Sequence, residues 1–361
     1  MPAYVSRLRA RFLPPPMPAG VPATLLLLVV IPLLAACNGR VSATEVRANG
    51  SAIGASGASS GVPGSAPAVA VPAARKTSPI VPPPSGTPPK QPLPVPAPAI
   101  AARAAVVIDD ATGAVLYDYN GRTRVPPASL TKIATAALAI DRGKLDDWVT
   151  VDYDFTDPTL NDATEMGLER GDRFRLRDLI YGMLLPSGAD ASIAIAHAIS
   201  GSEEAFVRDM NTFMESLGLY DTHFIDPHGV GGAAHVSTAY DLAMLSRYAM
   251  RQPLFADAVR AEAYRATGSR TIEVYNTNPW AFGYPGGDGV KSGYTEEAGP
   301  TLSASATRNG HRVIVVVLNS ARRNQDTTAL MDWAFQTFCW SDGSPGCSPG
   351  SQAIPRSTPA R

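Results

Sequence analysis

The sequence predicts one α/β domain in the C-terminal two thirds of a 361-residue chain, and three observations support this prediction. Residues 38–100 contain 13 of the 33 prolines. Between Phe12 and Tyr117 there is no aromatic side chain, so this part buries too little apolar surface to offset the entropy of ordering. After about Ala101, apolar runs follow one another as strands, helices, strands and a last helix. That order is typical of a sheet that joins both ends of a domain.

Composition and charge exclude several classes of protein. Hydrophobic residues make up 45% of the chain, which is enough for a sizeable core. The formal net charge of −1 offers no basic field, so we expect no nucleic-acid partner. Three cysteines are too few for a disulfide-rich miniprotein or a four-cysteine zinc site. The five histidines form neither an H-E-x-x-H nor an H-x-x-x-H pair, which argues against a zinc peptidase.

Residues 1–36 predict a signal peptide. Three arginines stand among the first 11 residues, and residues 20–36 are uncharged and rich in Leu and Val. Such a stretch is short for a membrane span. It ends in Leu34-Ala35-Ala36-Cys37, which resembles the lipobox of bacterial lipoproteins. The resemblance implies acylation of Cys37 and a membrane anchor on the extracytoplasmic side of a bacterial cell. An ordinary signal peptide or an uncleaved anchor is the alternative.

We expect a disordered Pro/Ala/Ser-rich tether over residues 37–100. Residues 79–98 are rich enough in proline to favour an extended polyproline II conformation. At ~3.1 Å per residue the tether would reach on the order of 200 Å when fully extended. A folded domain on such a tether can sweep a volume near a membrane.

The folded domain is expected over residues 101–338. A turn at residues 110–113 joins the apolar run 105–109 to the alternating stretch 114–118, which predicts a β-hairpin. Two prolines precede a predicted helix at residues 130–140. Further helices are predicted at residues 176–184, 190–199, 203–217, 238–250 and 327–338. An Asn309-Gly310 turn predicts a second hairpin between residues 301–307 and 312–319.

A tail over residues 339–361 carries Cys339 and Cys347. In an exported protein these two residues can pair and close a nine-residue loop, which stabilises by roughly 2–3 kcal/mol. Two free thiols are the alternative.

The first candidate site is Ser129-Leu130-Thr131-Lys132, the one S-x-x-K of the chain, at the start of a predicted helix. A spacing of three residues places the hydroxyl and the amine on one helix face. A serine is a weak nucleophile until a base takes its proton, and a neutral lysine amine can take it. The helix N-terminus also offers backbone N–H groups to a developing negative charge.

Lysine usage strengthens this candidate. The chain has five lysines against 26 arginines, and only Lys132, Lys144 and Lys291 lie in the predicted domain. Because an amine can lose its proton near neutral pH and a guanidinium cannot, a retained lysine indicates such a role. Lys291 opens the stretch Lys291-Ser292-Gly293-Tyr294. On an edge strand this stretch would present a cation and a hydroxyl beside a groove, where an extended peptide can pair with the strand.

Together with Pro186-Ser187-Gly188-Ala189, these stretches resemble the S-x-x-K, S-x-N and K-[TS]-G motifs of penicillin-recognising serine enzymes. The surrounding sequence narrows the resemblance to the D-alanyl-D-alanine carboxypeptidase family, the low-molecular-mass penicillin-binding proteins. The supporting stretches are VVIDDATGAVLYDYN, PPASLTKIATA, LLPSGADASIAIA, FIDPHGV, HVSTAYDLA and GVKSGYTEEAGPTLSASAT. The implied fold is β-lactamase/transpeptidase-like, with an antiparallel sheet, flanking helices and a mainly helical subdomain.

The resemblance implies a serine-type carboxypeptidase that cleaves the D-Ala-D-Ala end of peptidoglycan stem peptides and needs no cofactor. Ser129 attacks, Lys132 is the general base, and Ser187 relays a proton. Backbone N–H groups of Ser129 and Tyr294 form the oxyanion hole, and β-lactams inhibit by acylating Ser129. The implied catalytic residues are Ser129, Lys132 and Ser187, and the implied substrate-binding residues are Lys291, Ser292, Gly293 and Tyr294.

Ala189 departs from the family pattern, because it replaces the asparagine of S-x-N. In the family this amide hydrogen-bonds the catalytic lysine and the substrate. Its loss costs on the order of 1–3 kcal/mol if the partner groups stay unpaired. A catalytically weak peptidoglycan- or penicillin-binding lipoprotein is therefore an alternative, as is a D,D-endopeptidase or transpeptidase with the same site. A class A β-lactamase would need an E-x-x-L-N glutamate before Lys291, and none fits. We interpret His197 and His228 as structural.

Overall fold

The computed structural model describes residues 86–91, 95–155, 163–232 and 234–340. The predicted signal peptide, Cys37 and most of the predicted tether lie outside the described residues. Cys347, one half of the predicted disulfide, lies outside them as well. Within the described part of the chain, no helix has both the length and the apolar character that a membrane span requires.

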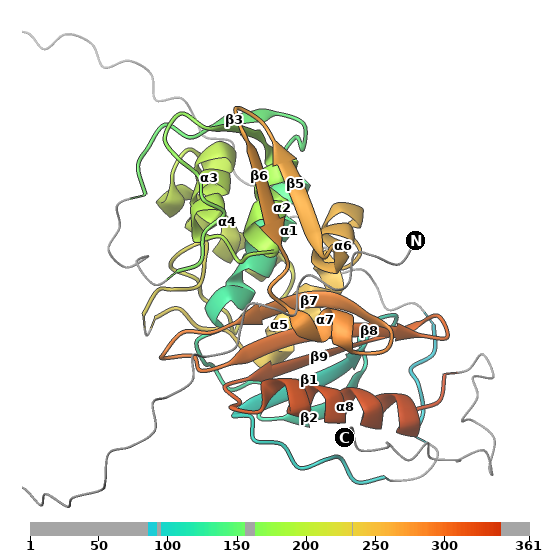
Figure 1. Ribbon diagram of the computed structural model, residues 1–361. Helices are drawn as coiled ribbons and strands as arrows, with labels where there is room; N and C mark the ends of the chain where they lie inside the picture. The colour runs from blue at the N-terminus through green and yellow to red at the C-terminus, as the bar shows by residue number, and fades with distance from the viewer. Residues whose placement is uncertain (1–85, 92–94, 156–162, 233, 341–361) are drawn as a thin grey trace, which may run out of the picture. The chain divides into compact units, whose positions relative to one another are not determined.

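A five-stranded antiparallel sheet forms the centre of the domain (Figure 1). Strands β1 and β2 come from the start of the domain and the other three from its end, so Ala104 of β1 lies opposite Leu318 of β9. This arrangement confirms the predicted α/β class and both predicted hairpins. The strands are β1 (Ala104–Asp109), β2 (Val115–Tyr119), β7 (Gly287–Gly293), β8 (Thr301–Arg308) and β9 (His311–Leu318), in the spatial order β2-β1-β9-β8-β7.

Helices cover both faces of this sheet, which explains why β1 and β9 are nearly continuous apolar runs. Successive side chains of a strand point to opposite faces. Val106 and Ile108 of β1 accordingly join the larger core, on the side of α5 (Ala239–Ala249). Ala105 and Val107 join a smaller core under α8 (Arg323–Thr337), which Figure 1 shows lying along the sheet.

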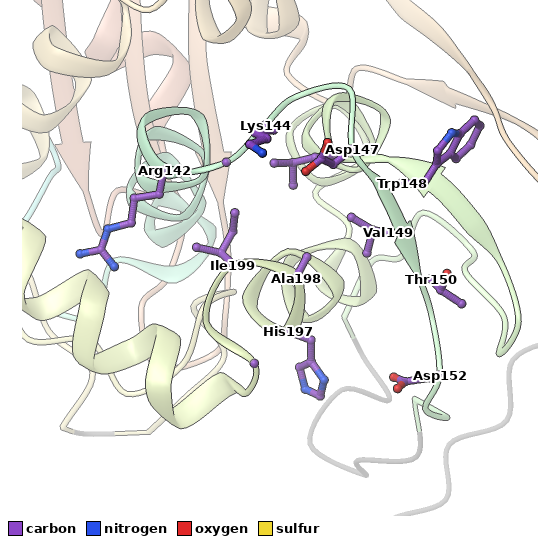
Figure 2. Close-up of a pocket in the computed structure, with 13 residues that line it drawn as sticks. Arg142, Lys144, Asp147, Trp148, Val149, Thr150, Asp152, His197, Ala198 and Ile199 are labelled. Atoms are coloured by element: carbon purple, nitrogen blue, oxygen red, sulfur yellow. The ribbon is translucent and has the colours of Figure 1, made fainter. Parts of the chain in front are cut away.

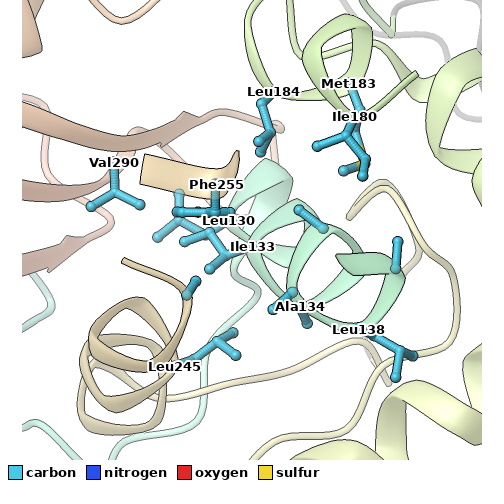
Figure 3. Packing of buried hydrophobic residues seen from close by; sticks show 14 of the residues in the cluster. Leu130, Ile133, Ala134, Leu138, Ile180, Met183, Leu184, Leu245, Phe255 and Val290 are labelled. Carbon is cyan, nitrogen blue, oxygen red and sulfur yellow. The ribbon is translucent and has the colours of Figure 1, made fainter. Parts of the chain in front are cut away.

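A mainly helical subdomain surrounds α1 (Lys132–Arg142), which continues from a short 3₁₀ turn, η1 (Ala128–Thr131). Apolar side chains from several elements bury α1, and Figure 3 shows them around Ile133 and Leu138. This burial fixes the N-terminal end of α1 relative to the sheet. The helices packed against α1 are α2 (Leu176–Leu184), α3 (Ala189–Ser200), α4 (Glu203–Ser216), α5 and α6 (Pro253–Arg260).

Six elements have no counterpart among the predicted ones. Five of them have three to five residues, too few for a hydrophobic period to show, and the sixth, α6, has eight. Helix α8 also begins earlier than the predicted residue 327, because its first turn, Arg323-Asn-Gln-Asp326, is polar. The unpredicted elements are β3 (Trp148–Thr150), β4 (Arg173–Arg175), α6, β5 (Ala263–Thr267), β6 (Thr271–Tyr275) and α7 (Pro279–Gly283).

Residues outside the predicted domain, 101–338, contact one another and the domain. Lys90, within the predicted tether, pairs with Cys339 through backbone N···O distances of 2.9 and 2.8 Å. The indole N–H of Trp333 donates to the Val95 carbonyl at 3.1 Å. Because these bonds use backbone groups, the composition of the proline-rich stretch gives no sign of them.

Candidate active site

The three sequence motifs meet in one cleft of about 750 Å³. The first comes from η1 and the start of α1, the second from the turn between α2 and α3, and the third from the end of β7. The motif residues that line the cleft are Ser129, Lys132, Ser187, Ser292, Gly293 and Tyr294. Lys291 is buried in β7 directly before them. Sites that are far apart in the sequence therefore share one cavity.

The amine of Lys132 lies beside the hydroxyl of Ser129. Its Nζ is 3.2 Å from Ser129 Oγ and donates a second hydrogen bond to the His228 carbonyl at 2.7 Å. Ala128, directly before the serine, has a φ of 52°. A residue other than glycine costs of order 1–3 kcal/mol in this left-handed region, so the surrounding structure must hold the turn. The serine and the lysine share one face, as the spacing predicts.

Burial changes the protonation of both lysines at the cleft. The Lys132 side chain is 1% exposed, and burial lowers its pKa to about 8, against the opposing charges of Asp226 and Asp190. Lys291 is 2% exposed, and burial, together with repulsion from Lys132 and Arg323, lowers its pKa well below the ordinary value. A neutral Lys132 amine is therefore accessible near neutral pH, as a general base requires.

Ser187 stands in a tight turn before α3, with a φ of 71°. Its carbonyl accepts a hydrogen bond from the Thr164 hydroxyl at 3.0 Å. The Asp190 carboxylate, in the first turn of α3, binds the backbone just after Thr164. It accepts the backbone N–H groups of Met166, Gly167 and Leu168, each at 2.8 Å. These bonds fix the cleft wall that faces β7.

We expect Asp190→Ala to lower the free energy of unfolding by about 3 kcal/mol, because four backbone N–H groups, those named above and that of Ala191, lose an acceptor. Urea denaturation at neutral pH measures the change. Asp190→Asn keeps one acceptor oxygen and is expected to lose less. Equal stability of wild type and Asp190→Ala would show that this carboxylate does not hold the wall.

Strand β7 forms the other wall as an edge strand, the arrangement in which Lys291, Ser292 and Gly293 can border a groove. Among the described strands it pairs with β8 alone, with Ser292 opposite Leu302. Arg323, the first residue of α8, also lines the cleft and donates to the Gly293 carbonyl at 2.7 Å. Arg323 carries no motif, so sequence reasoning missed it. Val230 lines the cleft as well. In the sequence it is the last residue of FIDPHGV, one of the stretches that support the family resemblance.

A second hollow, of about 500 Å³, lies at the other end of α1 and holds none of the motif residues. Figure 2 shows it between the ends of α1 and α3 and strand β3. His197 lines it, with its ring 4.3 Å from that of Tyr153. No three His, Cys, Asp or Glu side chains within the described ranges are grouped to hold a metal ion. The cleft around Ser129 is therefore the candidate active site.

Known proteins are similar to this chain over about two thirds of its length. Residues 91–322 match the Peptidase_S11 family model, described as D-alanyl-D-alanine carboxypeptidase. The D-alanyl-D-alanine carboxypeptidase DacF of Bacillus subtilis is 37% identical over 66% of this chain and 63% of its own length. The D-alanyl-D-alanine carboxypeptidase of Streptomyces sp. K15 is 37% identical over 66% of this chain and 88% of its own length. The crystal structure of the Streptomyces K15 DD-transpeptidase matches with a TM-score of 0.63 and 34% identity, over 67% of this chain and 99% of that one.

The chain thus spans less than two thirds of DacF and most of the Streptomyces protein. The family match, residues 91–322, includes every residue that lines the cleft except Arg323. The solved structure agrees with the antiparallel sheet, the flanking helices and the helical subdomain described above. On this evidence the chain belongs to the D-alanyl-D-alanine carboxypeptidase family of serine peptidases.

Proposed function

We propose that this protein is a serine-type D-Ala-D-Ala carboxypeptidase that trims peptidoglycan stem peptides through an acyl-enzyme on Ser129. One observation carries the proposal: the Lys132 amine lies 3.2 Å from the Ser129 hydroxyl, in a cleft bordered by the edge strand β7. An edge strand can pair with an extended peptide, which suits the end of a stem peptide. The names of the curated relatives support the same substrate.

In the first half of the reaction, the neutral Lys132 amine takes the proton of Ser129 while Oγ attacks the carbonyl carbon between the last two D-Ala residues. The carbonyl becomes a tetrahedral oxyanion. Ser187 relays the proton from Lys132 to the nitrogen of the terminal residue, the C–N bond breaks, and D-alanine leaves with a neutral amine. The shortened peptide stays on Ser129 as an ester.

In the second half, a water molecule gives a proton to Lys132 and attacks the ester carbon. The bond between that carbon and Ser129 Oγ breaks, and Oγ regains a proton. The products are a peptide with a new carboxyl group and the free enzyme. A β-lactam follows the first half alone, since its amide C–N bond opens when Ser129 attacks.

Lys291, Ser292 and Arg323 hold the terminal carboxylate of the substrate. Burial and repulsion disfavour the charged form of Lys291, whose pKa is lowered. A carboxylate entering the cleft supplies the missing negative charge and favours that form. Arg323 is charged at any relevant pH. This pair of cations favours a peptide with a free C-terminus.

The backbone N–H groups of Ser129 and Tyr294 form the oxyanion hole. Gly293 lets β7 approach the turn of the nucleophile, because a Cβ there would lie 2.9 Å from the Ser129 backbone nitrogen and 2.6 Å from Thr301 Oγ1. Donors of this kind act on charge that develops only in the transition state. The distance between η1 and β7 is therefore part of the catalytic geometry.

We expect Gly293→Ala to slow acylation by a β-lactam by about 100-fold or more, since the added methyl group displaces one oxyanion donor. Stopped-flow fluorescence with a fluorescent penicillin measures the rate. Gly283→Ala is the matched control, because its Cβ meets no atom within 4 Å. An unchanged acylation rate in Gly293→Ala would show that the close approach of β7 to the turn of the nucleophile does not contribute to catalysis.

Ala189 does not leave Lys132 without partners. Lys132 Nζ donates to the Ser129 hydroxyl and the His228 carbonyl, so an amide at position 189 is not needed to orient it. Ala189 itself is 1% exposed in a small apolar cluster against which Tyr153 and Phe155 pack. This arrangement supports an active enzyme rather than a catalytically weak binding lipoprotein.

Transpeptidation is a second candidate, because the Streptomyces K15 protein is named a carboxypeptidase in one comparison and a DD-transpeptidase in the other. In that reaction an amine of another peptide, rather than water, takes the acyl group from Ser129. A D,D-endopeptidase would use the same residues on a cross-linked peptide.

We further propose that Cys37 carries the lipid that holds the protein to a membrane, outside the cytoplasm where peptidoglycan lies. A lipoprotein carries two or three acyl chains, which suffice for stable attachment. Residues between Cys37 and the domain then act as the tether. The pairing of Cys339 with Cys347 stays a prediction.

A purified sample and a peptide ending in D-Ala-D-Ala test the main proposal. We expect covalent labelling by a fluorescent penicillin and release of D-alanine from the peptide. Addition of a free amine acceptor separates the candidates, since a new amide product indicates transpeptidation. Labelling without release of D-alanine would favour a binding lipoprotein, and the absence of both would contradict the proposal.

A further inference from the structure

Residues 226–231, here called the Asp226 turn, contact the helix that carries the catalytic lysine. The His228 carbonyl accepts a hydrogen bond from Lys132 Nζ at 2.7 Å. One helical turn further on, the Thr135 hydroxyl donates to the Pro227 carbonyl at 2.6 Å. The turn therefore binds α1 through two successive carbonyls, and one of them orients the base.

The Asp226 turn also packs against the backbone that precedes Ser129. Gly229 has a φ of 91°, and a Cβ there would lie 2.0 Å from the Ala128 carbonyl oxygen. Val230, the next residue, lines the active-site cleft. The turn thus touches the base, the turn of the nucleophile and the cleft wall at once.

The Asp226 carboxylate gives this turn its shape. Oδ1 accepts the backbone N–H groups of His228 at 2.8 Å and Gly229 at 2.5 Å, and Oδ2 accepts that of Gly231 at 2.6 Å. The carboxylate is only 13% exposed. The position of the His228 carbonyl therefore depends on the side chain two residues before it.

His235 lies beside the same carboxylate without neutralising it. The backbone N–H of Ile225 donates to His235 Nδ1 at 3.2 Å, so Nε2 carries the ring proton and donates to Thr131 Oγ1 at 2.7 Å. Burial lowers the pKa of His235. The Asp226 charge opposes this shift, and repulsion from His223 and Lys132 adds to it in smaller measure. A neutral ring leaves the negative charge of Asp226 available to Lys132.

We propose that Asp226 is a positioning residue for acylation: it holds the His228 carbonyl against the Lys132 amine, and its charge sets the pH range in which that amine acts as a base. The inference rests on the proposed function, in which Ser129 is acylated. It assigns a role to a residue outside the three motifs, and the role acts through both geometry and charge.

Several charged groups face the Lys132 amine. Of these, the two carboxylates favour its charged form, and burial disfavours it. Removal of the Asp226 charge leaves one carboxylate to oppose the burial, so the amine gives up its proton at lower pH. The charged or titratable groups are Asp226 and His228 of the Asp226 turn, His235, Asp190 of α3 and Lys291 of β7. Arg323 of α8 lines the same cleft and acts on Lys291.

Asp226→Asn tests the inference, since it removes the charge and keeps one oxygen that can accept hydrogen bonds. The measurement is the pH profile of the second-order rate constant for acylation by a fluorescent penicillin. In wild type the rate should rise through about pH 8, where Lys132 loses its proton. In Asp226→Asn we expect this rise to move to lower pH by about one unit, with a lower plateau.

Two variants separate charge from structure. Asp257→Asn removes a carboxylate that is 61% exposed on α6, and we expect an unchanged profile. Asp226→Glu keeps the charge but displaces it, so we expect a slower rate with the rise still near pH 8. Asp226→Glu also tests the inference if Asp226→Asn fails to fold. In that case, a rise in the acylation rate at a pH other than about 8 in Asp226→Glu would overturn the inference.

A profile of Asp226→Asn that is lower at every pH, with the rise in the wild-type position, would leave Asp226 a purely structural residue and overturn the inference. Wild type that is never labelled would overturn the proposed function and this inference with it. Wild type that is labelled, with a rise that does not move in Asp226→Asn, overturns the inference alone.

Discussion

Ser129→Ala is expected to slow covalent labelling by β-lactams by roughly 10⁴-fold or more and to abolish release of D-alanine. Ser187 and Ser292 also line the cleft, but the hydroxyl in contact with the Lys132 amine belongs to Ser129, at 3.2 Å. A hydroxyl without a base beside it stays a weak nucleophile. Intact-mass spectrometry after β-lactam treatment should show one adduct on wild type and none on the variant.

Ser292→Ala is the matched control for this experiment. It removes a hydroxyl from the same cleft but leaves Ser129 and Lys132 in contact, so an adduct should still form, more slowly. An adduct of full yield on Ser129→Ala would place the nucleophile at another residue. Because alanine is smaller than serine and Ser129 lies in a turn held by its neighbours, both variants should keep their thermal melting temperature.

The contact between Ser129 and Lys132 could be predicted because it is local. Three residues along a helical turn fix which side chains meet, whatever the rest of the chain does. The sheet could be predicted for a related reason, since the apolar runs of β1 and β9 reflect burial on both faces. The convergence of Ser187 and Ser292 on the same cleft came from the family resemblance, because no local rule brings them together.

Arg323 and Asp226 show what the sequence could not tell. Arg323 looks like any polar residue at the start of a helix, and its place in the cleft depends on how α8 packs on the sheet. His228 was interpreted as structural, and its side chain does lie buried beside Asp226. Its carbonyl, however, is a partner of Lys132, and the identity of a side chain gives no information about what its backbone oxygen binds.

Lys132→Arg is expected to lower the acylation rate by roughly 10³-fold at every pH, because a general base contributes about 10²- to 10⁴-fold and a guanidinium does not give up its proton. Burial lowers the pKa of Lys132 to about 8, so the amine is in its basic form above that pH and the wild-type rate should rise through it. The arginine variant should lack the rise altogether.

Lys144→Arg makes the same exchange on a lysine at the second hollow, away from the cleft, and should leave the rate and its pH profile unchanged. Arginine is larger than lysine and position 132 is 1% exposed, so a fall in rate could also come from a displaced helix. Lys132→Met separates the two causes, because it is apolar, unbranched and of similar length. If Lys132→Met keeps the melting temperature of wild type and is also inactive, the missing base explains the loss. If Lys132→Arg is active with the wild-type pH profile, Lys132 is not the general base, and another group must accept the proton of Ser129.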